Sequence, residues 1–242
     1  MRVASTDANR PPADQASPVY VWDLPTRLFH WSLAILVVAT FVAAKIGGNA
    51  MVWHGRIGLA ILGLLVFRIV WGLVGSTYAR FTQFVRGPTG IRVYLSGQWQ
   101  GLGHNPLGAL SVLALLGVLL LQVASGLFAN DDIAFEGYLV PLISSATSGD
   151  FTGIHRLLEN ALLLLVAAHV GAIIYYASVK KRNLVRPMLT GWDAGNPGQS
   201  ATGGGLFALL LAVLIAGLAV WAASGALLPP PPPVIPSTAP TW

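Results

Sequence analysis

Cysteine is absent from this sequence of 242 residues. Without cysteine the chain can form no disulfide, cannot attach a haem covalently and cannot hold a cysteine-ligated iron–sulfur cluster. Histidine, which occurs five times, is then the natural side chain for ligating a non-covalent cofactor.

Charged residues are also scarce. Only 10% of the residues are Asp, Glu, Lys or Arg, against about 25% in an ordinary soluble domain. Together with 55% hydrophobic residues and a mean hydropathy of +0.67, this composition predicts a membrane protein. The net charge of +5 does not indicate nucleic-acid binding, because the basic residues fall in loops between apolar segments. The first 19 residues contain no apolar signal-peptide core, so we expect no cleavable signal peptide.

Several apolar segments are long enough to cross the roughly 30 Å hydrocarbon core of a bilayer. They are residues 28–46, 52–74, 106–129, 154–177 and 206–228. Asn105 and Pro106 are typical of a helix start, as the N-cap and the first-turn proline. Pro25 allows the first helix to begin a turn earlier than its apolar run.

These segments predict an all-α membrane protein. We expect a polar N-terminal tail (1–19), a four-helix transmembrane bundle (20–192), a Gly-rich linker (193–205), a fifth transmembrane helix (206–228) and a Pro-rich tail (229–242). The Pro-rich tail favours an extended conformation, either without packing partners or as a docking strap for a partner subunit.

The loops on the two sides of the predicted bundle differ in charge. Side A, defined as the face that holds the N-terminus, carries Arg2, Arg10, Arg27, Arg80, Arg86, Arg92, Lys180, Lys181, Arg182 and Arg186. Side B carries Asp131, Asp132, Glu136 and Asp150 in its long loop 130–153, with Lys45, Arg56 and Arg156 near helix ends. The positive-inside rule makes side A cytoplasmic. We therefore expect five crossings of the bacterial inner membrane, with the N-terminus in the cytoplasm and the C-terminus in the periplasm.

The spacing of two histidines gives the most specific signal in the chain. His155 and His169 are fourteen residues apart in one apolar segment, so they differ in height by roughly 21 Å and point to nearly the same face. Ionisable residues inside a membrane span are costly and are functional candidates by default. One helix thus offers an imidazole near each side of the membrane.

The topology determines which histidines share a depth. His30 opens the first helix on side A, and His54 opens the second on side B. The two pairs that match in depth are His30 with His169 and His54 with His155. Each pair can ligate one six-coordinate haem b, which suits electron transfer because no axial position remains open.

Arginines accompany these histidines. Arg68 follows His54 by fourteen residues and therefore lies at the depth of side A, while Arg27 is one turn before His30. Arginine forms bidentate pairs with carboxylates, so both are candidates to bind haem propionates. Arg156 is the candidate on side B; for Arg56 we favour a position among the lipid headgroups.

Two further ionisable residues have alternative roles. Glu159 shares a face with His155 and is expected to pair with Arg156 or Arg56, or else to relay protons. His104 is expected at the side A surface, in a capping or headgroup role; the alternative is a contact to a propionate or a quinone.

Several motifs resemble one family, bacterial cytochrome b561 and the nickel-hydrogenase-type cytochromes b. The matching segments are VWDLPTRLFHW (21–31), HGRIG (54–58), FRIVWG (67–72), GHNPLG (103–108) and KRNLVRPMLTG (181–191). The resemblance covers about residues 20–192. It implies a four-helix bundle that holds two b haems, with His30, His54, His155 and His169 as ligands, and that exchanges electrons with a membrane quinone.

The chain departs from this family after Gly191, where the linker, the fifth span and the Pro-rich tail follow. The addition contains no residue that could ligate a haem, so we interpret it as lateral packing or as attachment to another subunit of a larger complex.

The leading functional prediction is a dihaem cytochrome that carries electrons between a periplasmic redox partner and the quinone pool. The acidic side B loop favours a basic partner, either a c-type cytochrome or a hydrogenase-like subunit. One alternative is a superoxide:quinone oxidoreductase, an activity of some relatives in the family, although an acidic loop does not attract an anion. Another is a mainly structural, tethering subunit.

Overall fold

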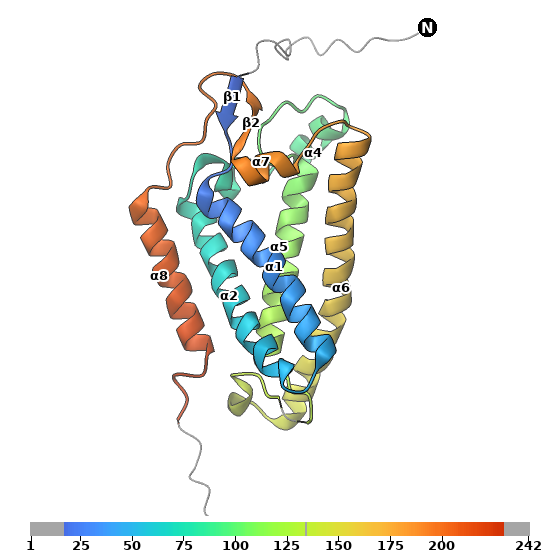
Figure 1. Cartoon of the computed structure of the whole chain (residues 1–242), viewed down its shortest axis with the longest axis vertical. Coiled ribbons are helices and arrows are strands. Elements are labelled where there is room, and N and C mark those ends of the chain that lie inside the picture. The colour runs from blue at the N-terminus through green and yellow to red at the C-terminus, as the bar shows by residue number, and fades with distance from the viewer. Residues whose placement is uncertain (1–16, 134, 230–242) are drawn as a thin grey trace, which may run out of the picture.

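The computed structural model describes residues 17–133 and 135–229, and its helices run roughly alongside one another (Figure 1). Within these residues five helices are long and apolar enough to cross a membrane. They are α1 (Leu24–Ile46), α2 (Ala50–Val74), α5 (Pro106–Leu127), α6 (Ser145–Ser178) and α8 (Leu206–Ala223). The predicted membrane fold with five helical spans is confirmed.

Side-chain caps explain where two of these helices begin. The Asp23 carboxylate accepts a hydrogen bond from the Thr26 backbone N–H at 2.7 Å, so α1 starts at Leu24, with Pro25 in its first turn. Asn105 caps α5 as predicted, because its Oδ1 accepts from the Gly108 backbone N–H at 2.7 Å.

Helix α6 begins nine residues before the predicted apolar segment. Ser144 caps it by accepting from the Thr147 backbone N–H at 3.2 Å, and the hydroxyl of the fully buried Ser148 donates to the Phe128 carbonyl at 2.8 Å. The expected loop 130–153 is therefore shorter, and Asp150 is helical. Hydropathy identifies only the part of a helix that faces lipid, so it missed this polar first section.

The helices pack as two neighbouring pairs. Helix α1 lies along α2 and α5 lies along α6, and the pairs join where α2 contacts α5. Seven buried side chains from all four helices form the central core: Phe29, Ile61, Leu65, Leu116, Leu119, Val123 and Leu162. Helix α8 lies outside this bundle against α2 (Figure 1). Its contact uses small residues, since Ala212 and Ala216 are buried and Val220 touches the position of Gly63.

Short elements cover the side A end of the bundle. They are η2 (Thr77–Ala79), α3 (Phe81–Phe84), α4 (Pro88–Leu95), α7 (Val185–Thr190) and a two-stranded antiparallel sheet of β1 (Ser17–Tyr20) and β2 (Trp192–Gly195). In the sheet, Tyr20 pairs with Trp192 and Ser17 with Gly195. At the side B end, η3 (Val140–Leu142) follows the loop that leaves α5 after Leu127.

The sheet revises two predicted boundaries, because it joins the end of the expected N-terminal tail to the start of the expected linker. The remainder of the polar tail (1–16) and the Pro-rich tail (230–242) lie outside the described residues, and so do the predictions made for them.

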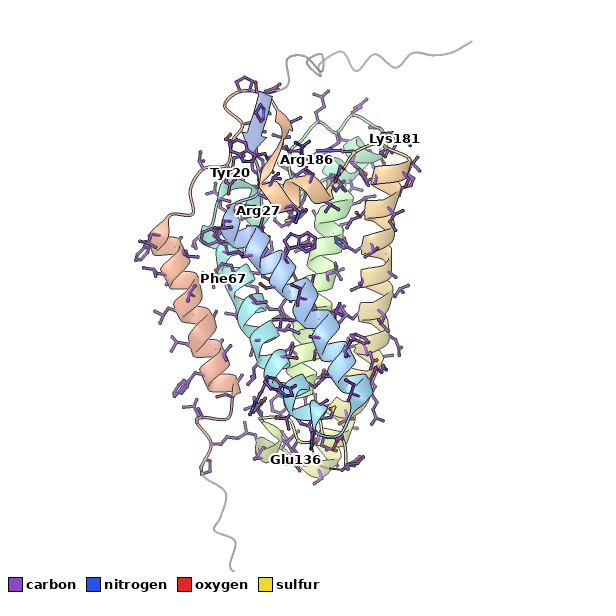
Figure 2. The ribbon with its side chains drawn as sticks, viewed as in Figure 1. Tyr20, Arg27, Phe67, Glu136, Lys181 and Arg186 are labelled. Atoms are coloured by element: carbon purple, nitrogen blue, oxygen red, sulfur yellow. The ribbon has the colours of Figure 1, made fainter. Side chains whose placement is uncertain are left out.

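The charge difference between the two ends is visible in the structure. Figure 2 shows Arg27, Lys181 and Arg186 gathered at the end that carries the sheet, and Glu136 at the opposite end. The first end is side A of the sequence analysis and the second is side B.

Candidate functional site

Two pairs of histidines face each other across the bundle. The ring centroids of His54 on α2 and His155 on α6 are 6.0 Å apart, and those of His30 on α1 and His169 on α6 are 6.4 Å apart. The structure thus brings together the same two pairs that the sequence analysis matched by depth.

The separation within each pair suits a metal between two imidazoles. Two metal–nitrogen bonds of about 2.0 Å, each extended by roughly 1.2 Å to the ring centre, place axial imidazole centroids about 6.4 Å apart. Within residues 17–133 and 135–229, no group of three or more His, Asp or Glu could hold a bare ion. A metal at either pair therefore needs its other ligands from a cofactor, and a porphyrin supplies four.

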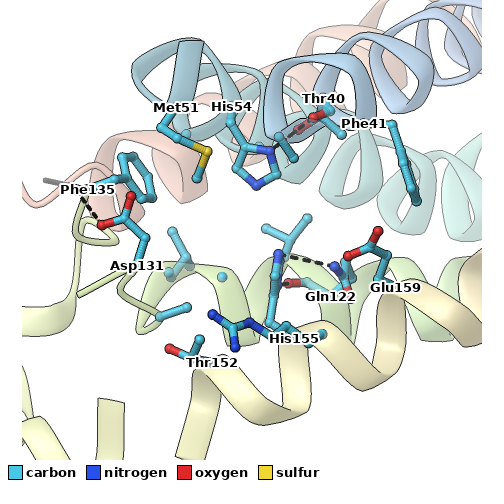
Figure 3. Close-up of a pocket in the computed structure, with 18 of the residues that line it drawn as sticks. Thr40, Phe41, Met51, His54, Gln122, Asp131, Phe135, Thr152, His155 and Glu159 are labelled. Carbon is cyan, nitrogen blue, oxygen red and sulfur yellow. Dashed lines mark hydrogen bonds between the residues drawn. The ribbon is translucent and has the colours of Figure 1, made fainter. Parts of the chain in front are cut away.

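The side B pair lines a cavity of about 460 Å³ (Figure 3). Residues of all four bundle helices and of the loop between α5 and α6 form its walls. His54 Nδ1 donates to the Thr40 carbonyl at 3.0 Å, and His155 Nδ1 donates to the Gln122 carbonyl at 2.9 Å. Because Nδ1 is the protonated nitrogen in both rings, each Nε2 keeps its lone pair. The Gln122 amide donates to His155 Nε2 at 3.1 Å, consistent with this tautomer. Both rings are thus oriented as metal ligands commonly are, by a bond from the other nitrogen.

Glycines make room around the side B pair. A Cβ at Gly55 would lie 2.9 Å from the ring of Phe135, and a Cβ at Gly126 would lie 2.9 Å from His155 Cε1. Phe135 also meets the His54 ring edge-on, with 6.4 Å between centroids. The glycine on α2 lets Phe135 of the loop pack closely, and the glycine on α5 lets His155 of α6 pack closely.

The side A pair has buried basic groups beside it. Arg68 is only 2% exposed and lies over the ring of Phe81, with 4.8 Å from its Cζ to the centroid. Its Nη1, like His30 Nδ1 and Arg27 Nε, is buried without a hydrogen-bond partner among the described residues. The Nη1 of Arg27 donates to the Leu189 carbonyl of α7, which holds this arginine at the start of α1. Unpaired buried donors at one site indicate an anionic ligand.

His104 does not have the surface role that the sequence favoured, and α5 is capped by its neighbour Asn105. The His104 ring packs between Trp22 and Phe84, with 4.6 Å between centroids in each case, and its Nδ1 is buried without a partner among the described residues. Burial, together with the nearby charges of Arg68, His30 and His169, lowers the pKa of His104 to about 3. A neutral third imidazole therefore adjoins the side A pair.

The predicted charges on side B lie at the cavity or near it. Arg156 lines the cavity and is exposed. Arg56 is exposed and stacks over Trp53, at 5.2 Å from the ring centroid. Glu159 lines the cavity too, but it forms its ion pair with Lys45 of α1 at 3.0 Å rather than with either arginine. This pair links α1 to α6 across the cavity.

Three residues at the side B cavity lie outside the sequence-based predictions: Thr40, Gln122 and Phe135. Gln122 carried a usable signal, because an amide inside an apolar span needs a polar partner. Thr40 orients His54 through its backbone carbonyl, which any residue type provides, and its hydroxyl also lies 3.1 Å from the same Nδ1. Phe135 reaches the site from a loop, whose path the sequence does not reveal.

Comparisons with known proteins identify the family of the chain. The family model described as prokaryotic cytochrome b561 matches residues 21–191. A probable Ni/Fe-hydrogenase B-type cytochrome subunit of Azotobacter vinelandii is 26% identical over 215 residues, covering 72% of this chain and 88% of the relative. A protein of the same description from Azotobacter chroococcum mcd 1 has the same identity and coverage. No solved structure matches significantly.

The matched residues include all four paired histidines and all four helices of the bundle, while α8 lies beyond them. The chain belongs to the prokaryotic cytochrome b561 family and is a multi-pass b-type cytochrome of membrane electron transfer.

Proposed function

We propose that this chain binds two b haems and conducts electrons across the membrane. His54 and His155 are the axial ligands near side B, and His30 and His169 are those near side A. The observation that carries the proposal is the pair of ring separations, 6.0 and 6.4 Å, each across the space between α6 and a neighbouring helix. When bound, each haem supplies reversible one-electron chemistry, and ligation on both axial sides leaves no position for oxygen.

The separation of the two centres follows from α6. Its histidines are fourteen residues apart, which corresponds to roughly 21 Å of helix. The edges of two porphyrins are closer than their centres, so an electron can pass from one to the other within the protein.

Arginines hold the haem carboxylates in this proposal. Arg68 and Arg27 bind the propionates on side A, since both have a buried nitrogen that lacks a partner among the described residues. Arg156 serves on side B from the rim of the cavity. The nearby Asp23 carboxylate offsets part of the charge of the buried Arg68, and a propionate would compensate the rest in bidentate geometry.

The charges at the two ends favour one orientation and one kind of partner. Side A, with Lys181 and Arg186, faces the cytoplasm of a bacterial inner membrane, and the exchangeable quinone binds near it. Side B, with Asp132 and Glu136, faces the periplasm and docks a redox protein with a basic surface. The relatives' description as hydrogenase cytochrome subunits favours a hydrogenase-type subunit, and a c-type cytochrome is the other candidate.

The other functions receive less support. Superoxide oxidation requires an anion to approach side B, where Asp131 and Glu159 line the cavity together with Arg156 and give it no net positive charge. A tethering role is compatible with electron transfer, because α8 packs on α2 outside the bundle and leaves the histidines untouched. We assign α8 to attachment within a larger complex.

Haem quantitation with a reduced-minus-oxidised spectrum tests the proposal. The purified chain should contain two b haems, and His54→Ala and His169→Ala should each lose one. Gly171→Ala is the matched control on α6, since nothing lies within 4 Å of its added Cβ. A His169→Ala variant that retains two haems and full electron transfer would contradict the assignment and favour the tethering role.

A further inference from the structure

The buried side chain of Asp23 joins the start of α1 to α2. Its Oδ1 accepts from the Thr26 backbone N–H at 2.7 Å, and its Oδ2 accepts from the indole Nε1 of Trp71 at 3.0 Å. The first bond caps α1, and the second fixes that cap to α2. Hydrogen bonds to a charged group are stronger than those between neutral groups, so the Trp71 indole holds the first turn of α1 in place.

This first turn leads directly to the side A site. His30 follows Asp23 by seven residues, which corresponds to about 10 Å along α1. Helix α7 holds the same stretch from another direction, because Trp31 Nε1 donates to the Met188 carbonyl at 3.2 Å. A shift of the α1 start would therefore move His30 relative to His169.

Trp71 is covered by a segment that lies beyond the family match. Its side chain is buried in one cluster with Ala212 of α8. The linker before α8 also lies against the indole, since a Cβ at Gly204 would be 3.0 Å from the ring. This linker is fixed beside the end of α2, where the Thr77 backbone N–H donates to the Thr202 carbonyl at 2.9 Å. The position of Trp71 thus depends on chain outside the four-helix bundle.

We propose that α8 and its linker support the side A site through Trp71 and Asp23. By covering the indole, α8 keeps its N–H directed at the carboxylate, and that bond keeps the start of α1, with His30, in place against α2. Trp71 is a positioning residue, because it acts on the haem through Asp23 and α1. This inference rests on the proposed binding of a haem by His30 and His169, and it gives α8 a role in haem retention in addition to attachment.

The choice of variant separates this bond from the charge of Arg68. The Asp23 carboxylate also offsets part of the Arg68 charge, so Asp23→Asn would change the bond and the charge balance together. Trp71→Phe removes the indole N–H and leaves both charges in place. A phenyl ring can still stack on Phe67, whose centroid is 5.9 Å from that of Trp71. A selective effect of Trp71→Phe on side A therefore reports the bond.

Haem release from the purified two-haem protein to excess apomyoglobin tests the inference. Trp71→Phe should speed release of the side A haem about tenfold or more, the factor expected for a lost hydrogen bond to a charged group, and leave side B release unchanged. Ala212→Leu overpacks the fully buried contact of α8 and should act in the same selective way. The single-haem proteins His54→Ala and His169→Ala identify which haem is released.

Electron paramagnetic resonance of the oxidised protein gives a second readout. The low-spin signal of a haem with two imidazole ligands depends on the angle between the planes of those rings. In Trp71→Phe the side A signal should shift, because the α1 start carries His30, and the side B signal should not. A general loss of stability would not shift one signal alone.

Two variants serve as controls. Val70→Ala loses packing in the cluster around Trp71 but keeps the indole N–H, and Ala222→Leu enlarges an exposed position of α8. Both should release haem at the rate of the unaltered protein. Leu209→Ala, which loosens the α8 contact without overpacking it, replaces Ala212→Leu if that variant does not fold, and it should also speed side A release.

The inference is overturned if Trp71→Phe releases both haems at unchanged rates, or if it speeds both releases equally. It also fails if Ala222→Leu acts like Ala212→Leu, since the effect would then not pass through the indole. These outcomes leave the binding of two haems intact. Fewer than two haems in the unaltered chain would instead overturn the proposed function itself.

Discussion

Replacing Gly126 by alanine should weaken the binding of the side B haem, because this glycine lies directly against a proposed axial ligand. An added Cβ would be 2.9 Å from His155 Cε1 and 3.2 Å from its Nδ1, whereas ordinary contacts begin at 3.4 Å. The ring has to move by about half an ångström to accept the methyl group. Its bond to the Gln122 carbonyl at 2.9 Å resists that movement.

The size of the effect follows from the cost of overpacking. Inserting a methyl group into a tightly packed site costs about 1–3 kcal/mol. If the strain is relieved by moving His155 off its axial position, the side B haem is retained about 5- to 150-fold more weakly. The Gly126→Ala protein should therefore lose haem on washing in detergent, down to one haem per chain, while the side A centre remains.

Gly117→Ala is the matched control, because this glycine is on the same helix and nothing lies within 4 Å of its added Cβ. Haem per chain and the reduced-minus-oxidised spectrum are measured for both variants. The reasoning is refuted if Gly126→Ala keeps two haems with unchanged spectrum and potentials, or if it loses the side A haem instead.

Three other changes test different parts of the structure. Arg68→Met removes the buried guanidinium and with it a charged hydrogen bond worth about 1.5–3 kcal/mol. The side A haem should then be released to apomyoglobin roughly 10- to 150-fold faster. An unchanged rate would argue against propionate binding. For His104, the pKa of about 3 lies below the ordinary 6.5, so the unfolded chain takes up the proton first. Acidification below pH 6.5 should then cost about 1.4 kcal/mol per pH unit, and His104→Gln should flatten the fall of the thermal midpoint between pH 6.5 and 5. Gly63→Leu should lower the thermal midpoint by displacing α8, because an added Cβ at Gly63 is already 3.0 Å from a Val220 methyl. The control Gly171→Leu should leave the midpoint unchanged, since nothing lies within 4 Å of its Cβ. Equal midpoints for the two variants would show that α8 does not stabilise the bundle.

Local properties of the chain were sufficient to predict the spans and the paired histidines. Hydropathy over about twenty residues reports whether a segment can enter lipid, and it needs no knowledge of neighbouring helices. The fourteen-residue interval between His155 and His169 fixes their heights and directions through helix geometry alone. The alternation of consecutive spans then gave the direction of each helix, and direction determined which residues share a depth.

Contacts between helices required the tertiary structure, because they depend on which element lies beside which. Glu159 pairs with Lys45, 114 positions earlier in the chain, since α1 and α6 face each other across the side B cavity. His104 is buried because β1 ends beside it and brings Trp22 onto its ring. The carbonyl of Gln122 orients His155 only because α5 lies along α6. The sequence determined which side chains are available at each depth of the membrane, whereas the packing decided what each of them touches and hence how its charge and basicity are set.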